Sequence, residues 1–235
     1  MTDQPDDKIR EYRAELGKRT TTFWERDNYS YDQAGDSPEV KEKGALISEA
    51  YRSGDLEKAK SLLAEALQKS PNELRYQNLK TLVFMLSGPV EEYKAKMKQG
   101  IKTLELAISK GSVYYAQASL TNLGVIAQNQ GSEYAEALHL AAHFLNVLQL
   151  KPLQNLICFY SRHRQDMAKA MEYFYVLIDA CPKSGKQWYE RIDIVEWGKK
   201  DIDLSALRNF PQFIREVQPT LEKAWNKLKD NHKNI

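Results

Sequence analysis

The chain of 235 residues is poor in several features that define protein classes. It has only two cysteines, Cys158 and Cys181, which form no disulfide framework and predict a reducing compartment. No run approaches 18 apolar residues, and the charged first residues lack the apolar stretch of a secretory signal. The formal net charge of +2 implies no strong field for polyanions. We therefore expect a soluble, cytoplasmic protein with no membrane contact.

Motifs for catalysis and metal binding are also missing. The sequence has no glycine-rich phosphate loop, no metal-ligand cluster and no nucleophile motif. His139 and His143 have the spacing of two ligands on one helical face, but no glutamate follows the first and no third ligand is evident. Cys158 and His163 would lie about 140° apart around a helix, which favours a buried thiol. We expect no enzyme activity, no metal and no cofactor.

What the sequence does contain is apolar residues at helical spacing. In the segment 45–72, "ALISEAYRSGDLEKAKSLLAEALQKSPN", one stripe precedes Gly54 and a second precedes Pro71. Glycine interrupts the first helix, and proline stops the second because it has no N–H to donate. The pattern predicts a helical hairpin with apolar stripes formed by Leu46, Ala50 and Tyr51 and by Leu56, Ala59, Leu62, Leu63, Ala66 and Leu67.

This hairpin resembles the tetratricopeptide repeat family. The matching positions are Leu46, Gly54, Asp55, Ala59, Leu63, Ala66 and Pro71, although Lys43 lies where the family has an aromatic residue. The resemblance implies an all-α, right-handed solenoid of helical hairpins. It also implies a concave groove lined by the first helix of each repeat.

Three Asn-Leu dipeptides support a repeated unit. Leu79, Leu123 and Leu156 each follow an asparagine near the start of an apolar run, at intervals of 44 and 33 residues. We interpret these pairs as equivalent positions on successive first helices. An extension of about 10 residues in the second unit accounts for the longer interval. Its late apolar residues are Ile101, Leu104, Leu106, Ala107 and Ile108, and the later units are punctuated by Gly131, Pro152, Asp166 and Pro182.

These signals predict three regions. Residues 1–38 form an extension that is mobile or lies in the groove, where it would be autoinhibitory. Residues 39–183 contain four repeats, and residues 184–235 form a cap or a degenerate fifth repeat. We expect the cap's first helix to bury Trp188, Ile192, Ile194 and Val195. Its second, kinked at Pro219, should carry a stripe of Phe213, Val217, Leu221, Trp225 and Leu228.

The family's groove positions fall on polar, mostly uncharged side chains. Amide side chains in a row can bond the main chain of a peptide, or they can brace the hairpins, and the sequence leaves both alternatives open. Gly44 and Ser48 stand where one subclass places residues that clamp a terminal carboxylate, which disfavours that ligand. The predicted groove residues are Tyr51, Arg52, Gln77, Asn78, Thr81, Thr121, Asn122, Asn129, Gln154, Asn155 and Arg162.

The sequence therefore favours a non-enzymatic scaffold or adaptor that binds a protein or peptide partner. The alternatives are a secretion-type client chaperone, or an accessory subunit of a larger enzyme or nucleoprotein complex that docks through residues 89–110. Aromatic residues cluster in 23–31 and 188–197, but neither cluster is interleaved with a basic stripe. Nucleic acid is therefore expected only through such a complex.

Overall fold

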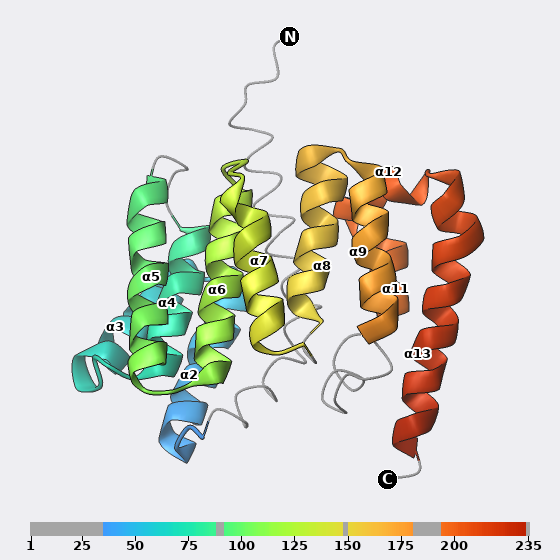
Figure 1. Cartoon of the computed structure of the whole chain (residues 1–235). Coiled ribbons are helices and arrows are strands. Elements are labelled where there is room, and N and C mark those ends of the chain that lie inside the picture. The colour runs from blue at the N-terminus through green and yellow to red at the C-terminus, as the bar shows by residue number, and fades with distance from the viewer. Residues whose placement is uncertain (1–34, 88–91, 148–149, 181–193, 234–235) are drawn as a thin grey trace. The chain divides into compact units, whose positions relative to one another are not determined.

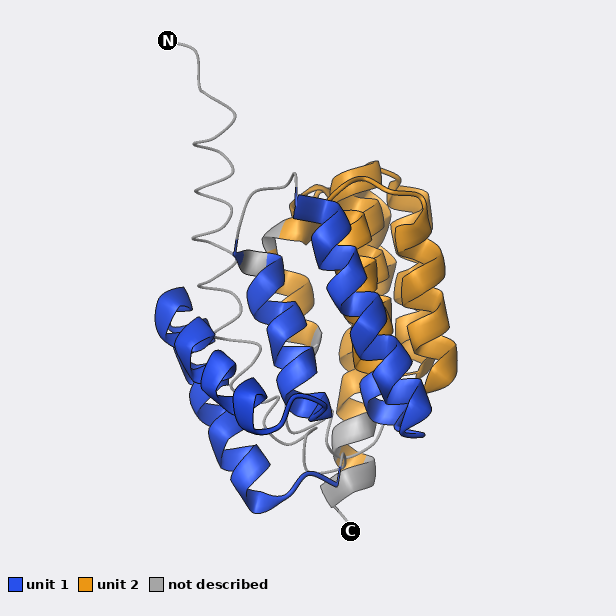
Figure 2. Cartoon of the chain, turned by 90° about the vertical axis from the view of Figure 1, so that its left-hand side faces the viewer, with its two compact units in different colours: residues 1–115 blue, residues 116–235 orange. Residues whose placement is uncertain are grey.

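The computed structural model describes residues 35–87, 92–147, 150–180 and 194–233, and throughout them the regular structure is helical, with no strand (Figure 1). The helices pack in adjacent pairs. The chain divides into two compact units, residues 1–115 and 116–235, which are described separately below (Figure 2). The all-α prediction is confirmed. No helix among the described residues is long and apolar enough to cross a bilayer.

Unit 1 begins with the predicted hairpin. Helix α2 (Pro38–Arg52) packs against α3 (Leu56–Lys69), and Gly54 turns the chain between them with a φ of 81°. Asp55 caps α3, because its carboxylate accepts a hydrogen bond from the backbone N–H of Lys58 at 3.1 Å. Helix α4 (Leu74–Leu86) contacts both of these helices, and α5 (Tyr93–Ser109) packs on α4.

The buried faces of α2 and α5 differ from the predicted ones. Leu46 is 46% exposed, and its neighbour Ile47 is fully buried instead. In α5, Ile101 and Ile108 are 43% and 65% exposed, whereas Ala107 is fully buried. The buried side of α2 includes Gly44, which lets Arg75 approach closely, and that of α5 includes Gly100.

Unit 2 holds most of α6 (Val113–Gln128) and all of α7 (Tyr134–Leu145), with Gly131 between them at a φ of 64°. Helix α8 (Lys151–Cys158) continues as the π-helix η3 (Phe159–Arg164) and packs against α7 and α9 (Met167–Ala180). Pro152 lies in the first turn of α8, where its missing N–H leaves no helical bond unmade. It therefore begins a helix in the structure.

The three Asn-Leu pairs occupy corresponding places. They lie in α4, α6 and α8, and Leu79, Leu123 and Leu156 are each at most 2% exposed. Each leucine is thus a core residue of its helix. Helix α5 has 17 residues and α7 has 12, which accounts for five of the eleven additional residues between the first two leucines.

The C-terminal part of unit 2 consists of α11 (Ile194–Lys200), η5 (Ile202–Leu204), α12 (Ser205–Arg208), the π-helix η6 (Phe213–Val217) and α13 (Gln218–Lys233). The predicted stripe is buried at Phe213, Val217, Leu221 and Trp225. The π-helix ends one residue before α13, whose second residue is Pro219, as expected where proline disturbs the helical hydrogen-bond ladder. Some predictions fall outside the described part of the chain. They concern Trp188 and Ile192, the side chains of Ile194 and Leu228, and residues 1–34.

Candidate partner-binding site

In unit 1, two predicted groove residues are engaged within the α4–α5 pair. The side-chain amide of Gln77 donates to the carbonyl of Pro71 at 2.6 Å and accepts from Gln99 Nε2 at 3.0 Å. The hydroxyls of Thr81 and Thr103 lie 3.1 Å apart, and Gln99 also donates to Thr103 at 3.3 Å. These four side chains form a buried polar bridge between the two helices, so Gln77 and Thr81 brace the pair.

The sequence pattern missed Gln99 and Thr103, although a signal for them was present. Gln99 lies 22 residues after Gln77, and Thr103 lies 22 residues after Thr81. Within each helix the two polar residues are four apart and therefore share a face. Polar pairs four residues apart on two neighbouring helices are therefore the signal by which a polar contact across the helix interface could have been sought.

The other predicted residues of unit 1 are also covered. Tyr51 and Asn78 are 4% and 3% exposed, and Arg52 is half-buried at the end of α2. Ser48, near the place where a carboxylate clamp would be expected, donates its hydroxyl to the carbonyl of Gly44 at 2.8 Å. These positions therefore present little accessible polar surface to a ligand.

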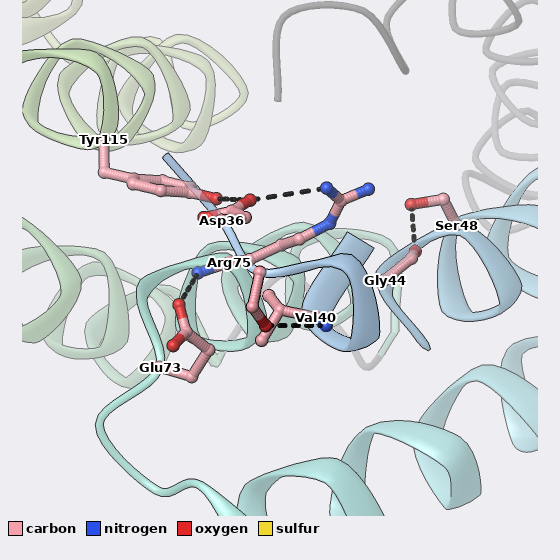
Figure 3. Close-up of polar contacts among 8 residues, drawn as sticks. Asp36, Val40, Gly44, Ser48, Glu73, Arg75 and Tyr115 are labelled. Carbon is pink, nitrogen blue, oxygen red and sulfur yellow. Dashed lines mark hydrogen bonds and ion pairs between the residues drawn. The ribbon is translucent and has the colours of Figure 1, made fainter. Parts of the chain in front are cut away.

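A buried ion pair that the sequence did not reveal lies beside them (Figure 3). The Arg75 guanidinium and the Asp36 carboxylate are 3.3 Å apart, with side chains 2% and 3% exposed. The Tyr115 hydroxyl donates to the same carboxylate oxygen at 2.8 Å. A Cβ added at Gly44 would lie 2.0 Å from Arg75 Nε, so only glycine lets this side chain cross α2. The cluster links Asp36, two residues before α2, to Arg75 of α4 and to Tyr115 in the first turn of α6.

In unit 2, the α6 residues have differing surroundings. Thr121 donates to the carbonyl of Gln117 one turn earlier at 2.9 Å, and Asn122 is 8% exposed. Gln117 donates to the carbonyl of Ala142 at 3.1 Å and so ties α6 to α7. Asn129 is exposed at the end of α6. Asn129 alone of the three predicted α6 residues is open to solvent.

Helix α8 carries polar groups whose hydrogen-bonding capacity is not used internally. Gln154 is 1% exposed, and neither atom of its amide has a hydrogen-bond partner in the part of the chain that the structure describes. The amide nitrogen of its neighbour Asn155 is likewise buried with no partner there. We call Gln154 and Asn155 the α8 amide pair. The Ser161 hydroxyl, in the following π-helix, is in the same condition.

The last predicted residue, Arg162, forms an ion pair with Asp203 of η5. Asp201 accepts hydrogen bonds from the Trp197 indole and from the backbone N–H of Asp203, both at 2.9 Å. The Cys158 thiol lies near these carboxylates, with the ligand atoms of all three residues within 4.8 Å of one another. The Asp203 carboxylate is thus paired with a cation, whereas that of Asp201 accepts from neutral N–H groups.

The His139 side chain is packed inside unit 2. Its ring is fully buried and lies 2.5 Å from the Cβ that any larger residue would place at Gly124. Its Nε2 lies 3.4 Å from Gln128 Oε1, and Gln128 Nε2 lies 3.5 Å from the ring of His163. Burial, reinforced by the charge of Lys151, lowers the pKa of His139 to about 3, so the ring is neutral. No third ligand group joins His139 and His143 within the described ranges.

Another cluster, also missed from sequence, joins α7 to α9. The Tyr173 hydroxyl donates to Glu136 at 2.6 Å, and Lys169 lies 3.8 Å from the same carboxylate. Burial acts to raise the pKa of Glu136, but hydrogen bonds from Tyr160 and Tyr173 and the charge of Lys169 outweigh it and lower the pKa. Burial and these bonds raise the pKa of both tyrosines. The raised pKa values keep both tyrosines protonated, and the lowered pKa keeps Glu136 ionised, so the cluster is suited to bracing the two helices.

Comparisons with known proteins do not identify a relative. No family model matches the chain, and no match was found among curated proteins or among solved structures. The resemblance to tetratricopeptide repeats therefore stays a prediction from the residues quoted above. The polar groups of the site have to indicate the function.

Proposed function

We propose that the chain is a non-enzymatic interaction scaffold, built as a solenoid of tetratricopeptide-like hairpins, that binds an extended peptide or a partner protein along its first helices. The observation that carries the proposal is the α8 amide pair. Gln154 and Asn155 match the proposed repeat pattern and lie in α8, which would be a first helix of that repeat. Both have hydrogen-bonding atoms without a partner among the described residues. Four other predicted groove side chains are engaged internally, namely Gln77, Thr81, Thr121 and Arg162.

The physical reason concerns the cost of buried polar groups. Nearly all such groups in folded proteins are hydrogen-bonded, and leaving one unpaired costs about 1–3 kcal/mol. The amide of Gln154 offers two donors and one acceptor, which match the carbonyl and N–H of a peptide main chain. Gln154 is 1% exposed, so a partner that supplies both groups has to displace the residues that cover this amide before it can remove the cost. The ligand class is therefore an extended main-chain segment.

The buried charged groups support a non-catalytic role. The carboxylate of Asp36 is held by Arg75 and Tyr115, and that of Glu136 by Tyr173 and Lys169. A general base or nucleophile needs a group that can accept or release a proton near neutral pH. Internal pairing makes these groups poor candidates for such chemistry.

The test compares the full chain with a variant that carries Gln154→Leu and Asn155→Leu as baits in affinity purification from the native host. Leucine has a similar volume and no polar atom. We therefore expect the double variant to be more stable, with a free energy of unfolding about 1–3 kcal/mol higher than that of the unaltered chain. We also expect it to lose the partner, measured by quantitative mass spectrometry. Higher stability together with lost capture would indicate a buried polar site kept for binding.

The matched control replaces two exposed amides, Gln68→Leu with Asn226→Leu, which should capture the partner as the unaltered chain does. A second variant, Asn122→Ala with Asn155→Ala, should also weaken capture while its melting temperature stays nearly the same. If the leucine variant retains the same partners, the amide pair is not the binding site. If it is destabilised instead, these side chains brace the fold.

A further inference from the structure

The exposed face of α5 has a composition that the packing of unit 1 does not explain. Lys94, Lys98 and Lys102 are exposed at intervals of four residues and therefore form one stripe along the helix. Ile101 and Ile108, seven residues apart on the same helix, are 43% and 65% exposed. We call these five residues the lysine–isoleucine face.

The lysines of this face lack ion pairs with the described residues. Some other lysines meet carboxylates, as in the pairs Lys43–Glu65 at 2.8 Å and Lys199–Glu222 at 2.9 Å. None of the three α5 lysines forms an ion pair with any residue that the structure describes. Like charges four apart destabilise a helix. Within the described residues no ion pair of these lysines offsets that repulsion.

The face is also not needed to hold α5 in place. The helix packs on α4 through its buried residues, which include Gly100, Thr103 and Ala107. Thr103 belongs to the polar bridge with Thr81, on that buried side. The two isoleucines therefore contribute little to the fold and remain available to a partner.

We propose that the lysine–isoleucine face binds an acidic amphipathic helix of a partner protein. A seven-residue interval between apolar residues is the spacing with which one helix meets another along a seam, and Leu104, half-buried between the isoleucines, continues it. Glutamate or aspartate residues flanking the partner's apolar seam would neutralise the lysine stripe. This surface is distinct from the α8 amide pair and does not depend on the function proposed for that pair.

An anionic membrane is the other surface that lysines and apolar residues can meet. Interfacial helices bury aromatic and leucine side chains a few ångströms deep, whereas the exposed residues of α5 include no aromatic. Glu105 is also exposed between the two isoleucines, and its charge disfavours anionic headgroups and an acidic helix alike, so it does not separate the two. The composition therefore favours a protein helix.

The test measures fluorescence anisotropy of a labelled synthetic helix added to the full chain. The probe has leucine at its heptad seam and glutamate at the flanking positions, and a second probe has lysine in place of each glutamate. We expect saturable binding of the acidic probe alone, weakened as salt rises from 50 to 300 mM because the pairing is electrostatic. The variant with Lys94→Glu, Lys98→Glu and Lys102→Glu should bind it at least tenfold more weakly, as should Ile101→Ser with Ile108→Ser.

The matched control reverses three other exposed lysines, Lys58→Glu, Lys223→Glu and Lys227→Glu, which changes the net charge equally. It should alter the affinity less than twofold, and circular dichroism should show that all variants remain folded. Equal loss in the control, or no binding of the acidic probe, would overturn the proposal. Binding to vesicles with 30% phosphatidylserine, lost in the α5 variants while the peptide fails to bind, would assign the face to membranes instead.

Discussion

At the scale of single residues, two glycines inside helices decide where large side chains lie. Gly44 leaves space for Arg75 to reach Asp36, and Gly124 leaves space for the ring of His139. Glycine is unfavourable in a helix interior by about 1 kcal/mol relative to alanine, so its presence there calls for a packing reason. In both places the reason is a buried polar side chain that crosses the glycine.

Gly124→Ala should destabilise the chain by about 1–3 kcal/mol, because the new Cβ would lie 2.5 Å from the His139 ring and the packed ring has to move. Urea unfolding followed by circular dichroism measures this change. Gly198→Ala is the control, since its Cβ would lie an ordinary 3.5 Å from Leu221 and alanine favours the helix. Equal stabilisation by both substitutions would show that His139 does not pack against Gly124.

His139 should make stability depend on pH. Its pKa is lowered in the folded chain from 6.5 to about 3, so below pH 6.5 the unfolded chain takes up a proton that the folded chain refuses. The contribution of neutral His139 is fully present above pH 6.5 and is lost as the pH falls toward 3. Between pH 7.5 and pH 5 the loss is about 2 kcal/mol.

The measurement is the difference in unfolding free energy between these two pH values, for the unaltered chain and for His139→Leu. The variant should lose less stability on acidification, because no group at this position titrates. The same pH dependence in both proteins would contradict the burial of a neutral ring.

At the scale of helices, the hydroxyl contact between Thr81 and Thr103 should couple α4 to α5. We expect a double-mutant cycle with Thr81→Val and Thr103→Val to give a coupling energy of about 0.5–1.5 kcal/mol, as for a buried hydrogen bond between neutral groups. A cycle that pairs Thr121→Val with Thr103→Val is the control, because Thr121 bonds within its own helix. Coupling as large in the control as in the α4–α5 cycle would mean that the bridge adds nothing specific.

Much of the helical layout could be predicted from the sequence. Gly54, Pro71 and Gly131 are local signals, and each lies between helices as expected. The rotation of a helix is not local, because Leu46 and Ile47 fit the apolar period almost equally well and the neighbouring helix selects between them. Contacts between distant residues, such as Asp36 with Tyr115, depend on the tertiary fold and leave no periodic trace.

The same distinction applies to the candidate site. Asn78, Asn122 and Asn155 lie in α4, α6 and α8, and their assignment to the first helices of a repeat stays a prediction. The repeat pattern could not separate amides with internal partners from those without, because that depends on residues such as Gln99 that come from another helix. The α8 amide pair emerges only when every bond is counted.

At the scale of the whole molecule, three kinds of polar group bear on folding and on the proposed binding. Buried pairs such as Arg75 with Asp36 join opposite charges inside the fold and link helices. The α8 amide pair is buried and unsatisfied, which we attribute to a peptide partner. The lysine–isoleucine face is exposed and uncompensated, which we attribute to an acidic helix.

Hydrogen–deuterium exchange of the full chain, with and without its captured partner, tests the central claim most directly. If the partner binds along the first helices, amide exchange should slow at least severalfold in α6 and α8 and stay unchanged in α3 and α13. Protection confined to α3 or α13, with α8 exchanging at its free rate, would contradict a binding site at Gln154 and Asn155.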